Sequence, residues 1–393
     1  MTVEFFSEGL GGGLKMSDEK NLPVRYGEKE LEFLKQALFS QNISPFFRNL
    51  DGGPLLQLFE KQIAEATGTS LCVAVSSGTA ALHCALLTLG VGREDEVIVP
   101  SLTFSATASA VVMTGATPVF ADIDPATYTI SIESVKRMIT PHTKAIIPVP
   151  LFGIPPLLGD FEQLGVERNI DILVDDAQSL GAKYCGKPTG SYGAAGCLSF
   201  QHTKTVSTGE GGAVCTDNPE VAEKVKRLRN HAEAYYGTDY VGWNFRMDEL
   251  RAAVGLAQME RLETLLHAQK QNAQYILTHL PEGLEPPTPY SHSEPSYSLI
   301  PLRLKESSQM ETILEAIAQT GVSQGQPGVN LGRGYGTPLY SKLAFASYHR
   351  DDCHNVERAV KEMLVVDIHR FRPLEAVEAD WEKVCQAVRK VVK

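Results

Sequence analysis

The chain has 393 residues, of which 43% are hydrophobic and 21% charged, and its formal net charge at pH 7 is −11. Single hydrophobic cores stop growing at roughly 250 to 300 residues, so a chain of this length is expected to form two domains. The acidic balance offers no broad attraction for nucleic acid or for an anionic membrane, and small molecules are therefore the expected partners.

The chain begins with a Gly-rich and then polar stretch up to Gly27, and residues 28–38 have the apolar spacing of a helix. We therefore expect an N-terminal arm and a first helix within residues 1–50. A second helix is expected over residues 54–66.

Strand and helix patterns alternate through residues 51–265, which we assign to a large domain. This alternation predicts three layers, in which helices cover both faces of a mixed, mostly parallel sheet. Strands are expected at residues 71–75, 96–99, 117–123, 144–149, 171–174, 197–200 and 212–216, with a helix at 104–114.

An amphipathic stretch at 248–262 predicts a helix that leaves the large domain, and the Pro-rich segment 280–289 marks a boundary. Residues 266–393 are assigned to a smaller α+β domain. The Gly-rich stretch 331–338 is expected to be a loop rather than a nucleotide-binding turn, because no strand is predicted before it. The elements expected in this domain are a strand near 297–304 and helices near 309–319, 354–364 and 378–392.

The seven cysteines form no Cys-x-x-Cys pair and mostly lie in apolar runs, which indicates buried free thiols in a reducing compartment. No segment has about 18 consecutive apolar residues, and the N-terminus lacks the basic start and apolar stretch of a secretion signal. We expect a cytoplasmic protein with no membrane span and no metal site.

The first candidate site motif is the turn Ser76-Ser-Gly-Thr79, which follows a strand pattern and opens a helix. Backbone N–H groups at a helix start, together with the positive end of the helix dipole, favour a phosphate, and Gly78 lets the backbone approach it closely. The alternative is an ordinary N-cap, in which serine or threonine precedes a helix.

The second motif is Asp175-Asp176, at the C-terminal end of the strand expected at 171–174. Ligands of open α/β sheets bind at that end. A carboxylate facing a heteroaromatic ring nitrogen keeps that nitrogen protonated, because an adjacent opposite charge favours the charged form. We assign this role to Asp175 and a helix-capping role to Asp176.

The third motif is Lys204, on a small-polar loop between the β-rich runs 197–200 and 212–216. Most lysines are solvated surface charges, but a lysine on a rigid loop can form a Schiff base with an aldehyde. An anion anchor, a pyridinium partner and an aldehyde-capturing amine are together what pyridoxal phosphate requires. The three motifs in series therefore predict a pyridoxal-phosphate site.

In these motifs, and in residues 89–107, 115–124 and 242–258, the sequence resembles the DegT/StrS family of pyridoxal-phosphate-dependent sugar aminotransferases. The resemblance covers roughly residues 22–265. It implies the aspartate aminotransferase-like fold type I and a homodimer with shared active sites.

The resemblance also implies which residues hold the cofactor phosphate. Gly78 and Thr79 would bind it through the turn, and Ser199 would add a hydroxyl. Asn244 would reach the same phosphate from the partner subunit.

Four further residues are implied to contact the cofactor ring or its aldehyde. Lys204 would capture the aldehyde and move the proton during transamination, and Asp175 would pair with the ring nitrogen. Phe104 would stack on one ring face. Gln178, expected one helical turn after Asp175, would lie against the ring or its phenolic oxygen.

Two positions depart from the family pattern: Pro150 stands where a histidine is usual, and Ala232 where a glycine is usual. His202 and His231 are left outside the catalytic set, because a lone histidine is more often a packing or hydrogen-bonding group. Arg246 is a candidate ligand for the donor carboxylate, with a structural role beside an aromatic ring as the alternative.

The expected function is transfer of an amino group from L-glutamate or L-glutamine to a nucleotide-linked or phosphorylated keto-sugar, or to a cyclitol ketone. The stretch 51–53, ahead of the helix expected at 54–66, favours an antibiotic-type cyclitol or amino-sugar pathway. One alternative is a pyridoxamine-phosphate-dependent sugar dehydratase, which is disfavoured because such proteins have histidine in place of Lys204. A non-catalytic regulatory or binding protein is disfavoured by the complete cofactor set, and a nicotinamide-dependent oxidoreductase by the absence of Gly-x-Gly-x-x-Gly after an early strand.

Overall fold

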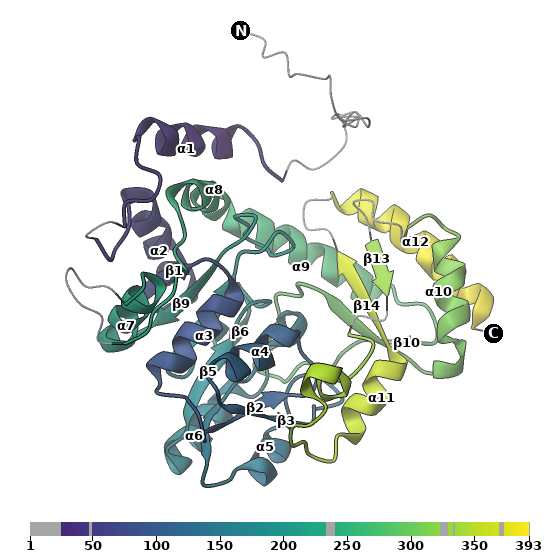
Figure 1. Cartoon of the computed structure of the whole chain (residues 1–393). Coiled ribbons are helices and arrows are strands. Elements are labelled where there is room, and N and C mark those ends of the chain that lie inside the picture. Colours follow the sequence, from purple (N-terminus) through teal and green to yellow (C-terminus); the bar gives the residue numbers. More distant parts are fainter. Residues whose placement is uncertain are drawn as a thin grey trace.

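The computed structural model describes residues 25–46, 49–232, 240–322, 329–332, 335–368 and 373–392. Its largest element is a seven-stranded sheet in the order β1-β9-β8-β5-β4-β2-β3 (Figure 1). Four of the six neighbouring pairs are parallel, and β9 runs antiparallel to both β1 and β8. The expected mixed, mostly parallel sheet is confirmed. Its strands are β1 (Leu71–Val75), β2 (Glu96–Pro100), β3 (Thr117–Ala121), β4 (Thr143–Ile146), β5 (Asp171–Asp175), β8 (Ala195–Ser199) and β9 (Gly212–Thr216).

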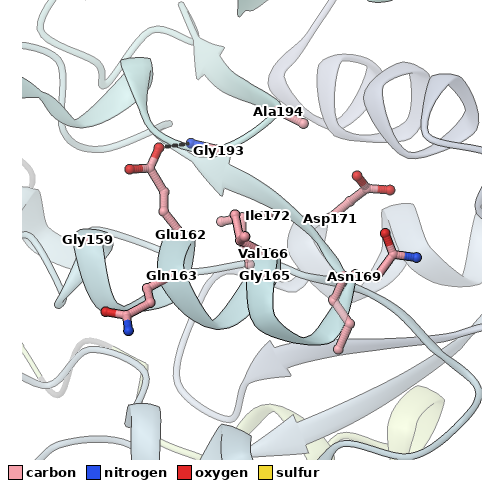
Figure 2. Close-up of a pocket in the computed structure, with 11 residues that line it drawn as sticks. Gly159, Glu162, Gln163, Gly165, Val166, Asn169, Asp171, Ile172, Gly193 and Ala194 are labelled. Atoms are coloured by element: carbon pink, nitrogen blue, oxygen red, sulfur yellow. Dashed lines mark hydrogen bonds between the residues drawn. The ribbon is translucent and has the colours of Figure 1, made fainter.

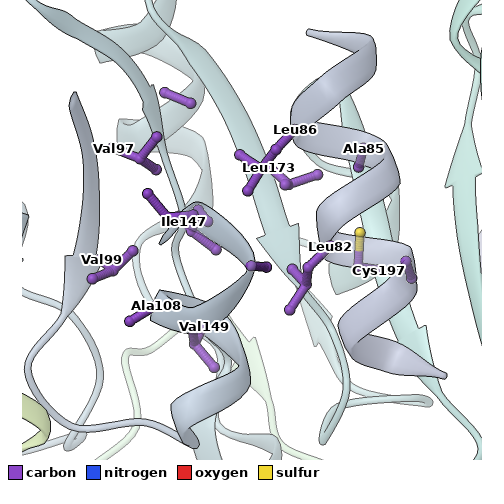
Figure 3. Packing of buried hydrophobic residues seen from close by; sticks show 14 of the residues in the cluster. Leu82, Ala85, Leu86, Val97, Val99, Ala108, Ile147, Val149, Leu173 and Cys197 are labelled. Carbon is purple, nitrogen blue, oxygen red and sulfur yellow. The ribbon is translucent and has the colours of Figure 1, made fainter. Parts of the chain in front are cut away.

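Helices cover both faces of this sheet, because successive strand residues point to opposite sides and both sides are apolar. In β1, Val73 joins the cluster formed with α3, α4 and α7, whereas Ala74 joins the cluster formed with α2 and α8. Figure 3 shows the first cluster, in which Leu86 of α3 lies over Leu173 of β5. The helices α5 and α6 pack on the second face at β2, β4 and β5. The bounds are α2 (Pro54–Thr67), α3 (Gly78–Thr88), α4 (Ser105–Met113), α5 (Ile132–Met138), α6 (Leu158–Arg168), α7 (Pro219–Arg229) and α8 (Glu249–Met259).

A four-stranded sheet lies in the C-terminal part of the chain, in the order β10-β12-β14-β13 and with every pair antiparallel. The helices α9, α10 and α12 pack on it around the buried Trp381. The elements are α9 (Leu262–Thr278), β10 (Leu284–Glu285), β12 (Ile300–Leu304), α10 (Met310–Ala318), β13 (Val329–Gly332), α11 (His354–Glu362), β14 (Met363–Ile368) and α12 (Leu374–Val391). A small third sheet is made of β11 (Ser293–Glu294), β6 (Lys183–Tyr184) and β7 (Lys187–Pro188).

The first helix, α1 (Glu28–Phe39), lies along α8. The Glu30 carboxylate accepts a hydrogen bond from Gln258 Nε2 at 2.6 Å and forms an ion pair with Arg261 at 2.6 Å. These contacts fix the first turn of α1 against the C-terminal end of α8. The expected N-terminal arm lies outside the described residues, except for residues 25–27.

Several element boundaries differ from those expected. The helix expected at 248–262 is two helices, because the backbone at Arg261 (φ −117°, ψ 17°) is not helical. Residue 363 begins β14 instead of continuing α11, because its backbone is extended (φ −85°, ψ 125°). A strand, β13, begins before the loop expected at 331–338 and includes the first two residues of that stretch.

Two further expectations are corrected by the structure. The strand expected at 144–149 ends at Ile146, since the prolines at 148 and 150 have no N–H for a sheet. Cys185 is exposed, while the other six cysteines are buried as expected. In the segments that the structure describes, no helix is long and apolar enough to cross a bilayer.

Candidate functional site

One edge of the large sheet gathers the predicted site residues. Val75 of β1, Gly212 of β9 and Ser199 of β8 form a single row across three strands. The chain therefore leaves β1 and β8 at the same edge, and β5 leaves it there too at Asp175. Ligands of α/β sheets bind at this carboxyl edge.

The turn after β1 opens α3 and is built to approach Ser199 closely. Ser77 is the N-cap of α3, and its Oγ accepts a hydrogen bond from Ala80 N at 3.1 Å. The N–H groups of Gly78 and Thr79, in the first turn, have no acceptor within the helix. A Cβ added at Gly78 would lie 2.9 Å from Ser199 Cβ, so only glycine allows this approach. The turn is thus an N-cap whose first N–H groups lie beside a hydroxyl, which is the arrangement that an anion site requires.

Asp175 is a buried carboxylate at the end of β5. Its Oδ2 accepts a hydrogen bond from Thr107 Oγ1 at 2.7 Å, and its Oδ1 accepts one from Ala177 N at 3.3 Å. Burial raises the pKa of Asp175, and Thr107, the Ala177 amide and the positive charge of Lys204 oppose that rise. A cation facing Asp175 would oppose the effect of burial in the same way. Thr107 has no role in the sequence analysis, although it lies one helical turn after Phe104.

Phe104 precedes α4 and is the N-cap residue of that helix. Its carbonyl accepts a hydrogen bond from Thr107 N at 3.3 Å, which places Phe104 one turn from the residue that binds Asp175. The Phe104 residue is 61% exposed, unlike most aromatic residues of the described chain, so a ring face is available for a planar ligand.

Lys204 lies on the loop between β8 and β9, and Arg25 and Tyr26, which precede the N-cap of α1, hold this loop. The Lys204 N–H donates to Gln201 O at 2.8 Å, and the Lys204 carbonyl accepts a hydrogen bond from Arg25 Nη2 at 3.1 Å. Tyr26 shares a hydrogen bond with Ser207 Oγ at 3.0 Å. Sequence reasoning missed Arg25 and Tyr26, because no motif marks a contact between segments so far apart.

Gln178 lies in a turn after β5, not on the helix that was expected. Its Oε1 accepts a hydrogen bond from Phe152 N at 3.0 Å, and its Nε2 donates to the Tyr335 hydroxyl at 2.7 Å. Neither partner was predicted, and Tyr335 belongs to the stretch expected to be a loop.

Asp176 does not cap a helix, which corrects the sequence-based assignment. Its carboxylate is buried and accepts hydrogen bonds from the hydroxyls of Ser179 and Thr189. Burial raises the pKa of Asp176 to about 7, the same hydroxyls oppose the rise, and the negative charge of Asp175 adds to it.

Asn244 is exposed, whereas the residues on either side of it pack inward. The rings of Trp243 and Phe245 are stacked at 5.9 Å beside the buried His83. Phe245 O accepts a hydrogen bond from Ser76 N at 2.8 Å, which ties this segment to the turn before α3. Because side chains alternate along an extended segment, the inward rings direct Asn244 outward.

The remaining candidates are two histidines and one arginine. His202 and His231 are both exposed. Arg246 donates to Asn230 Oδ1 at 2.9 Å and lies 5.9 Å from the Phe46 ring centroid. Ala232, where the resemblance leads one to expect glycine, has a φ of +57°, a conformation that favours glycine.

A surface pocket lies at the other end of β5, away from this edge (Figure 2). Asp171, the first residue of β5, and Ala194, which precedes β8, are among its lining residues. Glu162 in the wall accepts a hydrogen bond from Gly193 N at 2.9 Å. The pocket is therefore separated from Asp175 by the length of the strand.

The residues at the carboxyl edge fit pyridoxal phosphate. The close approach of Gly78 to Ser199 leaves a backbone cradle for a phosphate, and the buried carboxylate of Asp175 favours a cationic ring nitrogen. The loop that carries Lys204 begins at this same edge, and the positive charge of Lys204 acts to lower the pKa of Asp175.

Comparison with known proteins agrees with this chemistry. The family model described as the DegT/DnrJ/EryC1/StrS aminotransferase family matches residues 29–389. Over 248 residues the chain is 38% identical to GDP-perosamine synthase of Escherichia coli O157:H7, a match that spans 62% of this chain and 66% of that protein, just under two thirds of its length.

Two further matches span nearly the whole chain. The spore coat polysaccharide biosynthesis protein SpsC of Bacillus subtilis strain 168 is 32% identical over 395 residues, which cover 95% of this chain and 96% of SpsC. The structure of Spr1654 from Streptococcus pneumoniae in its PMP form aligns with a TM-score of 0.84 at 25% identity, over 94% of this chain and 99% of that one.

Proposed function

The chain belongs to the DegT/DnrJ/EryC1/StrS aminotransferase family, and on that basis we propose that it is a pyridoxal-phosphate-dependent sugar aminotransferase. It moves an amino group from L-glutamate or L-glutamine to a keto-sugar, nucleotide-linked or phosphorylated, or to a cyclitol ketone. The relatives named for perosamine and for spore coat polysaccharide support a sugar acceptor. The observation that carries the proposal is the common sheet edge shared by Gly78, Asp175 and the Lys204 loop.

Each residue at this edge has a defined task in the proposal. Gly78, Thr79 and Ser199 bind the cofactor phosphate, and Asp175 keeps the ring nitrogen protonated. When bound, pyridoxal phosphate supplies a cationic ring that withdraws electrons from a neighbouring carbon and so stabilises negative charge there. Phe104 and Gln178 restrict the ring from its face and from its edge.

Lys204 is the base and the nucleophile. Its Nζ would hold the cofactor through the aldehyde carbon, and once a donor amine is bound the same Nζ would remove the proton from the donor α-carbon. In the second half-reaction the same Nζ returns a proton to the acceptor carbon that receives the amino group. Lys204 therefore needs a fixed main chain and a mobile side chain.

The organisation of the molecule belongs to the same proposal. Residues 1–50 form an arm and first helix, 51–265 the cofactor-binding domain and 266–393 a smaller domain, in a cytoplasmic homodimer. The exposure of Asn244 between two partly buried aromatic neighbours supports its reaching the phosphate of the partner subunit.

A spectroscopic experiment tests the function. Purified protein reconstituted with pyridoxal phosphate should absorb in the visible range, and L-glutamate or L-glutamine should bleach that band. The Lys204→Ala variant should show no cofactor attached after borohydride reduction. A colourless wild-type protein, or one that no amine donor bleaches, contradicts the proposal. A panel of keto-sugars with one donor then identifies the acceptor.

A mixing experiment tests the shared site. Lys204→Ala and Asn244→Ala proteins are each assayed alone, then unfolded together, refolded and assayed as mixed dimers. One of the two sites in a mixed dimer has both intact residues if Asn244 serves the partner, so activity should return. Activity that does not exceed that of the separate variants contradicts a shared site.

A further inference from the structure

The Gln178 amide is fixed from both ends by residues that are far away in sequence. Phe152 N is 3.0 Å from Gln178 Oε1, and the Tyr335 hydroxyl is 2.7 Å from Gln178 Nε2. A main-chain N–H can only donate, so the amide oxygen must face Phe152 and the NH2 group must face Tyr335. One Nε2 hydrogen is then committed to Tyr335, and the second remains for another acceptor.

The loop that supplies the Phe152 N–H is held in a strained conformation. Phe152 has φ +61° and ψ 9°, in the left-handed region that is unfavourable for a residue with a Cβ. The following Gly153 (φ +79°) lies so close to residue 296 that an added Cβ would be 2.5 Å from Ser296 Oγ. Such a conformation persists only where the surroundings enforce it, and here it directs an N–H at Gln178.

Tyr335 completes the arrangement from the segment that follows β13. Its ring centroid is 5.9 Å from that of Phe152. Burial raises the pKa of Tyr335 to about 12, the hydrogen bond from Gln178 opposes this, and the charge of Asp175 adds to it. The hydroxyl therefore stays protonated at neutral pH, and the influence of Asp175 places Tyr335 within electrostatic reach of the candidate site.

We infer that Tyr335 is a positioning residue that acts through Gln178: it fixes the amide so that the second Nε2 hydrogen donates to an oxygen of the bound cofactor ring. The inference rests on the proposed function, because it gives Gln178 a defined donor role at the same site. The cofactor ring is most sensitive to such a donor through its own protonation equilibrium, which sets its absorbance.

The Tyr335→Phe variant tests the inference, because it keeps the ring beside Phe152 and removes only the hydroxyl. We expect the pH midpoint of the cofactor absorbance change to move by about half a unit or more, and kcat to fall about tenfold, with the donor KM changed less than about twofold. The matched control is Tyr340→Phe, five positions along the same segment, which removes a hydroxyl that donates to Glu357 Oε1 at 3.0 Å. The cofactor absorbance of this control should change with the same pH midpoint as that of the wild type.

A second variant separates an effect through Gln178 from a general disturbance. Gln178→Met removes the same contact from its other side and should move the absorbance midpoint in the same direction. In the Gln178→Met background, Tyr335→Phe should add little further change, because residues that act as one unit are not additive. If Tyr335→Phe does not fold, a Gln178→Met variant whose absorbance titrates like that of the wild type still overturns the inference.

The outcomes distinguish failure of the proposed function from failure of the inference about Tyr335. A wild-type protein that neither absorbs nor bleaches contradicts the proposed function. A wild-type protein that bleaches, together with Tyr335→Phe and Gln178→Met variants that titrate like the wild type, overturns the inference alone. Independent, additive shifts from the two variants also overturn it.

Discussion

The guanidinium of Arg25 donates a hydrogen bond to the main-chain carbonyl of Lys204 at 3.1 Å, across 179 residues of sequence. The carbonyl of Arg25 itself accepts a hydrogen bond from Gln258 Nε2 at 3.0 Å, so α8 holds the arginine in place. The backbone of Lys204 is thereby connected to the segment just before α1.

The Arg25→Ala substitution should loosen the Lys204 loop. Loss of one hydrogen bond from a charged donor costs about 1.5 to 3 kcal/mol, so we expect cofactor affinity to fall about tenfold or more. Absorbance titration of the apoprotein with pyridoxal phosphate measures this. Arg168→Ala, at an exposed position of α6, is the control. Equal affinities in the two variants would show that the contact does not stabilise the site.

The Asp175→Asn substitution should leave a folded protein with a poorly activated cofactor. A neutral amide no longer favours the cationic ring nitrogen, and we expect kcat to fall by about 10² or more. Asp171→Asn, at the other end of the same strand, should change kcat less than about twofold because it lies at the opposite edge. If kcat falls by a similar factor in both variants, the assignment of Asp175 as the partner of the ring nitrogen is contradicted.

The Asp176→Asn substitution should alter how stability depends on pH. Burial raises the pKa of Asp176 to about 7, above that of the unfolded chain, so ionising it opposes folding. Its favourable contribution is complete below about pH 4 and is lost as the pH rises through about 7, a change on the order of a few kcal/mol. Urea unfolding from pH 4 to 8 should therefore show a smaller loss of stability in the variant. Asp217→Asn, which changes an exposed carboxylate, should lose as much stability between pH 4 and 8 as the wild type. If Asp176→Asn also loses as much stability as the wild type, the assignment is contradicted.

The Gly78→Ala substitution should weaken phosphate binding through a direct clash. The added Cβ would lie 2.9 Å from Ser199 Cβ and 3.4 Å from the Leu198 carbonyl, so the turn must move. We expect affinity for pyridoxal phosphate to fall about tenfold, close to 1.4 kcal/mol. Gly92→Ala, where nothing lies within 4 Å, provides the matched backbone change. Isothermal titration with the cofactor compares the two, and unchanged binding in Gly78→Ala would rule out the cradle.

Local patterns were enough to predict the sheet and the three motifs at its edge. Apolar runs such as residues 71–75 and 171–175 form strands because their side chains are buried on both faces. The turn at Ser77 and the acid at Asp175 could be located because small polar turn residues and the end of an apolar run are visible within a few residues of sequence. The roles assigned to these residues remain predictions.

Contacts across the fold could not be predicted in the same way. Asp176 was assigned as a helix cap, but its carboxylate accepts a hydrogen bond from the buried hydroxyl of Thr189, thirteen residues later. Gln178 was placed on a helix, but its amide is held by Phe152 and by Tyr335, 157 residues away. Tertiary packing decides these positions, and no residue spacing records it.

The antiparallel direction of β9 restricts the loop that carries Lys204. Since β8 and β9 are antiparallel neighbours, the chain that leaves at Ser199 re-enters the sheet at Gly212, directly opposite. The intervening segment is a hairpin connection and never has to cross to the far side of the sheet, as a connection between two parallel strands must. Both ends of the segment that carries Lys204 are held by adjacent strands, so its two attachment points cannot separate unless the sheet itself opens.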